Sequence, residues 1–208
     1  MKLVRYAPDE LLAKYHSIRS QVPVDVFYSS PKHGKTMEFW CAAQFARGYA
    51  TNLAPCSIWI HEGDAQAYFD FQLEVDARKL NFQLTEVQLA GRRRGDEYRK
   101  SGPSGYTTVD DWNKGEEFGG EWVASAIKRK WVKYGGDVSE LSLLVYVNYV
   151  AVEHPYLTLR EQIADAAAPF RSVWLLNGHA IACVATRDRD LSAQAGWMFV
   201  PDDPCDEL

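Results

Sequence analysis

Several features typical of membrane proteins and disulfide-bonded secreted proteins are missing from this chain. Its four cysteines, Cys41, Cys56, Cys183 and Cys205, form no Cys-x-x-Cys pair and are irregularly spaced. Because Cys41 and Cys183 lie within apolar runs, we expect buried free thiols rather than disulfides. No run approaches the roughly 20 apolar residues that span a bilayer, and the N-terminus has no apolar stretch long enough for a signal peptide. We therefore expect a cytoplasmic protein with no membrane contact.

The composition is that of a globular chain without a strong charge of either sign. The 208 residues are 47% hydrophobic and 25% charged, with a formal net charge of −5. This balance argues against a protein that coats nucleic acid by bulk charge. No internal repeat is present. We expect one domain over residues 1–200, with its core at about 36–185, followed by an acidic flexible tail over 201–208.

Hydrophobic periodicity predicts an α/β (α+β) fold with a mixed β-sheet, a meander of strands and flanking helices. The 90–120 segment holds seven glycines and charges of both signs, and we expect a long loop there. A four-residue turn is expected at 76–79. Helices are expected over 8–20, 36–49, 121–134 and 158–168. Strands or extended segments are expected over 22–28, 57–61, 67–75, 80–89, 141–152, 173–176 and 179–185.

Polar side chains interrupt two of the predicted strands. Asp70 lies in one, and Glu86 and Gln88 lie two residues apart in the next, where strand alternation places them on one face. A carboxylate at the polar end of an otherwise apolar strand face needs a partner or a metal. Mg²⁺ binds one or two carboxylates together with water and substrate phosphate. Asp70 and Glu86 are therefore candidate metal ligands.

This pattern resembles that of the PD-(D/E)XK nuclease-like superfamily over roughly residues 36–150. Asp70 matches the first acid, Glu86 the second and Gln88 the lysine position, while Glu38 matches a glutamate that some members carry in the preceding helix. The resemblance implies a restriction-endonuclease-like fold and Mg²⁺-dependent phosphodiester hydrolysis of DNA or RNA. Asp70 and Glu86 would bind the metal, Gln88 would position water, and Glu38 would assist.

Two departures from that pattern favour an alternative function. Phe69 stands where the motif has proline, and Gln88 replaces the lysine. The alternative is an inactive nuclease-like fold that binds a protein or nucleic-acid partner. Strand parity adds a condition, because a four-residue turn places Asp70 opposite Thr85, on the other face from Glu86. A shared metal site then requires a bulge or an odd turn, and losing one of its two repelling carboxylates should raise stability without metal.

A basic cluster follows the candidate acidic strand. Residues 89–135 hold ten Lys and Arg against seven Asp and Glu. Such side chains can hold phosphates near a metal, so they are candidate nucleic-acid contacts. The alternative is a solvated loop with internal ion pairs. The candidates are Arg92, Arg93, Arg94, Arg99 and Lys100 in the predicted loop, and Lys128 and Arg129 on the following helix.

Overall fold

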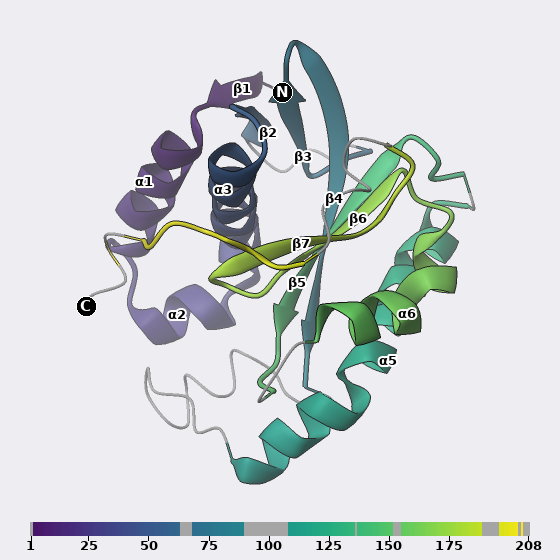
Figure 1. Cartoon of the computed structure of the whole chain (residues 1–208). Coiled ribbons are helices and arrows are strands. Elements are labelled where there is room, and N and C mark those ends of the chain that lie inside the picture. Colours follow the sequence, from purple (N-terminus) through teal and green to yellow (C-terminus); the bar gives the residue numbers. More distant parts are fainter. Residues whose placement is uncertain are drawn as a thin grey trace.

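The computed structural model describes residues 2–62, 68–89, 108–135, 137–151, 155–188, 196–203 and 205. These residues build one twisted mixed sheet with helices on both faces (Figure 1). The expected α+β class and mixed sheet flanked by helices are therefore confirmed. The restriction-endonuclease-like detail of that expectation is not.

The sheet has eight strands whose spatial order follows the chain, β1 to β8. The first four pair antiparallel, β4–β5 and β5–β6 pair parallel, and β6–β7 and β7–β8 pair antiparallel. Both parallel pairs need a crossover connection, which the helices α5 (Val109–Lys133) and α6 (Tyr156–Ala167) supply. The strands are β1 Lys2–Tyr6, β2 Ser57–Glu62, β3 Phe71–Val75, β4 Arg78–Gln88, β5 Leu141–Asn148, β6 Ser172–Leu176, β7 Ala180–Thr186 and β8 Met198–Phe199.

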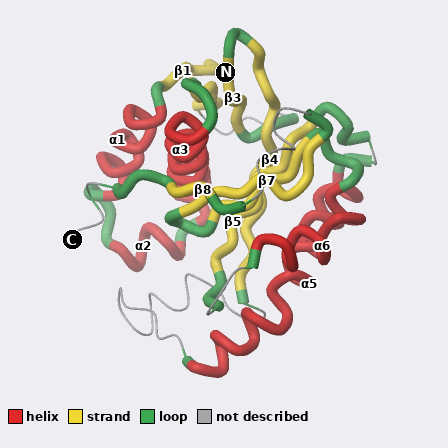
Figure 2. The backbone as a smooth tube through the Cα atoms, in the orientation of Figure 1, coloured by secondary structure: helices red, strands yellow, loops and turns green. Residues whose placement is uncertain are grey.

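The helices divide into two groups, one on each face of the sheet (Figures 1 and 2). One core packs Phe45 of α3 against Phe82 and Trp174. The other core packs Ile127 of α5 and Ile163 of α6 against the opposite face. The first group comprises α1 Pro8–Arg19, α2 Val24–Ser29, the 3₁₀ turn Pro31–His33 and α3 Gly34–Asn52; the second comprises α5 Val109–Lys133 and α6 Tyr156–Ala167.

The central strand β5 confirms the main prediction about the sheet. Leu141, Leu143, Leu144 and Val145 are fully buried, because both faces of β5 are covered by helices. Strand β5 lies parallel to β4 in continuous register from Asn81↔Leu141 to Gln88↔Asn148. An apolar run without alternation is the expected signature of such a strand.

Three local predictions are wrong. Residues 24–29 form α2 rather than a strand, with Phe27 only 1% exposed in the α1–α3 core. Residues 109–120 of the loop expected at 90–120 are helical instead, since α5 starts at Val109 behind a capping box of Thr108 and Asp111, while residues 90–107 lie outside the described residues. The turn between β3 and β4 has two residues, Asp76 and Ala77, both at positive φ, which is the geometry of a tight hairpin.

The α5 glycines mark close packing rather than a loop. A Cβ at Gly115 would lie 1.8 Å from the carbonyl oxygen of Val150, and one at Gly119 would lie 2.4 Å from the Tyr149 hydroxyl. These glycines let α5 approach the end of β5 at a distance that no side chain permits. Their density, which suggested a loop, has this tertiary cause.

The remaining expectations concern cysteines, membranes and the tail. All four cysteines are free thiols, with Cys41 and Cys183 buried, as expected. Among the described helices, none combines the length and apolar character that crossing a bilayer requires. Asp203, inside the segment expected to be a flexible tail, is only 6% exposed.

Candidate binding site

A cavity of about 460 Å³ lies between α2, the start of α3 and the second halves of β4 and β5. Its volume is within the range of small-molecule sites, roughly 300–1,000 Å³. One part of its wall is apolar and the other is polar. The apolar lining is Phe27, Tyr28, Met37, Cys41, Leu84 and Tyr146; the polar lining is Ser29, Ser30, His33, Glu38, Thr85, Glu86 and Gln88, with Gly34 completing it.

Three of the four residues matched to the nuclease pattern line this cavity. Glu86 and Gln88 line it together, consistent with the strand alternation that places both on one face of β4. Glu38 reaches it from α3. The structure thus brings together side chains that lie nearly fifty residues apart in the chain.

Asp70 does not line the cavity, and its carboxylate is instead hydrogen-bonded to the backbone of β4. Its Oδ2 accepts a hydrogen bond from the Leu84 backbone N–H at 2.6 Å, and its own N–H donates to the Phe82 carbonyl at 2.8 Å. Strand β3 begins one residue later, at Phe71, whereas β4 continues to Gln88. The Asp70 side chain therefore supplies an acceptor where the ladder between the two strands stops.

The β3–β4 register ends before Asp70. Phe71 pairs with Phe82, and no bulge interrupts the pairing from there to Val75↔Arg78. Asp70 lies outside that pairing, since its N–H donates to the carbonyl of Phe82, the residue already paired with Phe71. The two-residue turn has the same parity as the expected four-residue turn, so the turn itself does not supply the condition for a shared metal site.

Glu38 lies where the cavity meets a cluster of charged side chains. Burial raises the pKa of its carboxyl, the ion pair with Lys35 partly offsets this, and the negative charge of Asp70 adds to it. From the other side of the sheet, Lys130 donates to Gln83 Oε1 at 3.1 Å. Burial lowers the pKa of the Lys130 ammonium, and Asp70 and Glu38 oppose that shift. The positive charges of Lys35 and Lys130 thus offset the negative charges of Glu38 and Asp70.

Glu86 supplies the exposed carboxylate of the cavity. Its Oε1 accepts a hydrogen bond from Asn148 Nδ2 at 2.6 Å, across the parallel β4–β5 pair. Beside it, Tyr146 is held edge-on by Trp40, with ring centroids 5.3 Å apart. The sequence offered no signal for Asn148 or Tyr146, because their roles depend on the β4–β5 register.

Aromatic rings form the opposite wall. His33 stacks on Phe27 at a centroid distance of 5.1 Å, and Phe27 meets Tyr28 edge-on at the same distance. The Arg19 guanidinium lies 5.3 Å and 5.6 Å from the centroids of Phe27 and Tyr28. These two rings already take part in a cation–π contact.

Among the basic residues predicted to bind nucleic acid, those that the structure describes do not line the cavity. Lys128 and Arg129 are exposed on α5, which covers the opposite face of the sheet from α3. Arg92, Arg93, Arg94, Arg99 and Lys100 lie outside the described residues.

Comparison with known proteins identifies no family. No family model and no curated protein matches the chain. Among solved structures, the chain is similar to a protein of unknown function from Pseudomonas aeruginosa strain PAO1 described as belonging to the monooxygenase superfamily. The similarity covers 95% of this chain and 97% of that one, with 14% identity and a TM-score of 0.45.

These findings correct the resemblance to the PD-(D/E)XK superfamily. The similar solved structure is described as a monooxygenase-superfamily protein and not as a nuclease. In addition, the Asp70 carboxylate accepts a hydrogen bond from the Leu84 backbone and does not line the cavity that Glu86 lines. The predicted nuclease function, with its inactive nuclease-like variant, is therefore wrong. That Mg²⁺ binds at Asp70 and Glu86 stays an untested prediction.

Proposed function

We propose that this chain binds a small organic cation, an amine carried on an apolar body, in the cavity between α2, α3, β4 and β5. One observation carries the proposal: Glu38 and Glu86 line the same cavity, whose wall also includes the aromatic rings of Phe27, Tyr28, His33 and Tyr146. Carboxylates attract an ammonium group, while aromatic rings accept both an apolar body and a cation on their faces.

The accessibility of the two carboxylates favours Glu86 as the partner of the ammonium, because Glu86 is exposed whereas Glu38 is half-buried. Lys35 already forms an ion pair with Glu38, which neutralises much of that carboxylate's charge. Glu86 is exposed at the cavity, and the Asn148 amide holds one of its oxygens. An oriented carboxylate loses less side-chain freedom when it pairs with a ligand.

The lining favours an organic cation over a metal ion. Among the described residues, the group of three His, Cys, Asp or Glu side chains close enough to share an ion lies elsewhere and uses none of the cavity's residues. The polar lining is also rich in hydroxyl and amide groups, which suit the N–H donors of an amine.

The proposal is tested with three ligands that share a body but differ in charge. We expect phenethylamine to bind, and phenethyl alcohol and hydrocinnamate to bind more weakly, in calorimetric or NMR titrations of the whole chain. Replacing Glu86 by Gln keeps the shape of the side chain and removes its charge. For an exposed ion pair worth up to about 1 kcal/mol, Kd for the amine should rise roughly five-fold.

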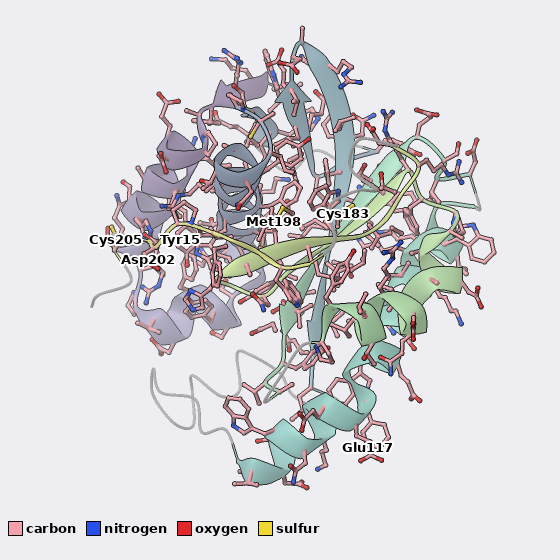
Figure 3. The ribbon with its side chains drawn as sticks, viewed as in Figure 1. Tyr15, Glu117, Cys183, Met198, Asp202 and Cys205 are labelled. Carbon is pink, nitrogen blue, oxygen red and sulfur yellow. The ribbon has the colours of Figure 1, made fainter. Side chains whose placement is uncertain are left out.

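Glu117→Gln is the matched control, because Glu117 is exposed on α5, on the far side of the sheet (Figure 3). It should leave the amine affinity unchanged. Equal affinity for the amine and the alcohol would contradict the proposal. So would an unchanged Kd in Glu86→Gln, or no binding by any member of a panel of arylalkyl and alkyl amines.

A further inference from the structure

Three potential metal ligands meet where the end of the chain crosses α1. His16 Nε2, a carboxylate oxygen of Asp203 and the Cys205 thiol sulfur all lie within 4.8 Å of one another. His16 Nε2 is 3.0 Å and 2.8 Å from the two Asp203 oxygens. Figure 3 shows Cys205 and Asp202 beside Tyr15, the neighbour of His16 on α1. None of the three ligands lines the cavity between α2 and β4.

The Asp203 carboxylate is held in place by several donors. Its side chain is only 1% exposed. Gln44 Nε2 approaches Oδ2 at 3.4 Å, and the Cys205 backbone N–H donates to Oδ1 at 3.1 Å. Such hydrogen bonds to the remaining lone pairs orient a carboxylate as a ligand.

Arg47 fixes the segment that brings Asp203 to α1. The Arg47 guanidinium donates to the carbonyls of Pro201 and Asp202 at 3.0 Å and 2.9 Å. Its Nε also donates to Asp9 of α1 at 2.9 Å. Because Arg47 is itself only 8% exposed, the end of the chain is held against α1 and α3 by a buried side chain. Packing and hydrogen bonds therefore hold Asp203 against α1, beside His16.

We propose that His16, Asp203 and Cys205 form a site for Zn²⁺. Imidazole, carboxylate and thiolate are the three ligand types that Zn²⁺ binds in proteins, whereas the thiolate makes the site unsuitable for Mg²⁺. Three protein ligands leave one tetrahedral position for water or another small ligand. Metal binding joins the end of the chain to α1 and releases the thiol proton.

The distances fit the proposed ion. In a tetrahedral zinc site, ligand atoms ~2.0–2.3 Å from the metal lie ~3.5 Å from one another. The His16–Asp203 distance of 2.8 Å must open slightly, and the sulfur, within 4.8 Å of both, must approach by about 1 Å at most. Cys205 is exposed, so rotation of its side chain can supply that movement.

The test uses the full chain, stripped of metal and kept reduced near neutral pH. Calorimetry and equilibrium dialysis should give one Zn²⁺ per chain. Co²⁺ should bind in its place and produce a thiolate-to-cobalt charge-transfer band in the near ultraviolet. Cys205→Ser removes an exposed ligand without disturbing the core, so it should abolish that band and weaken Zn²⁺ binding by about ten-fold or more.

His16→Gln should weaken Zn²⁺ binding to a similar extent. His179→Gln is the control, because His179 is exposed near the β6–β7 turn and should not affect binding. The proposal is overturned if the unaltered chain binds no Zn²⁺, or if Cys205→Ser retains the same affinity. It is also overturned if Co²⁺ binds without the charge-transfer band. Those results would leave His16 and Asp203 as a hydrogen-bonded pair that only fastens the end of the chain.

Discussion

Replacing Asp70 by Ala separates the structural role of this carboxylate from the metal-binding role expected of it. A metal site shared with Glu86 would contain two repelling carboxylates, and removing one would raise stability in metal-free buffer. In the structure, Asp70 Oδ2 instead accepts the Leu84 N–H at 2.6 Å. We therefore expect Asp70→Ala to lower the free energy of unfolding.

The size of the loss follows from the environment of that hydrogen bond. Asp70 and Leu84 are both half-buried, so the N–H left without its acceptor is only partly open to water. Hydrogen bonds to charged groups contribute ~1.5–3 kcal/mol, and partial exposure places this one near the lower end. We expect a loss of about 1.5 kcal/mol for Asp70→Ala. Asp70→Asn should lose less, because the amide oxygen still accepts.

Urea denaturation in metal-free buffer, followed by circular dichroism, measures both variants. Asp165→Ala is the control, since Asp165 is exposed on α6 and its replacement should change stability by less than about 0.5 kcal/mol. The midpoint should fall with an unchanged denaturant slope. If Asp70→Ala proved as stable as the unaltered chain, or more stable, the structural account of Asp70 would be refuted.

Two further expectations concern packing and pH. In Gly115→Ala, the new Cβ would meet the Val150 carbonyl oxygen at 1.8 Å. This clash should outweigh the ~1 kcal/mol that alanine gains in a helix, so urea denaturation should show a clear loss of stability. Gly34→Ala, with open space around its Cβ, should show none. Because the pKa of Glu38 is raised from 4.5 despite Lys35, Glu38→Gln should gain stability over the unaltered chain as pH rises above that value. Denaturation at acidic and neutral pH checks this, and a gain confined to acidic pH would contradict it.

Local sequence patterns were sufficient to predict the elements that depend mainly on residues close to them in the chain. The apolar run of β5 predicted a strand covered on both faces, since only such a strand lacks alternation. Asn177-Gly178, a typical hairpin-turn pair, joins the expected strands at 173–176 and 179–185, and Gly178 has φ of 90° in the β6–β7 turn. Strand alternation also placed Glu86 and Gln88 on one face, and both line the cavity. Each of these inferences depends on contacts within a few residues.

Tertiary packing decided what the local patterns could not. The glycines of α5 resemble those of a loop, and only the close approach of Val150 and Tyr149 explains them. The role of Asp70 depends on the β3–β4 register, which the two-residue turn sets. His16 and Asp203 are separated by 187 residues and meet because Arg47 fixes the carbonyls before Asp203. The sequence specifies which chemical groups the side chains carry, but which of these groups share a site depends on strand register and on packing between distant segments.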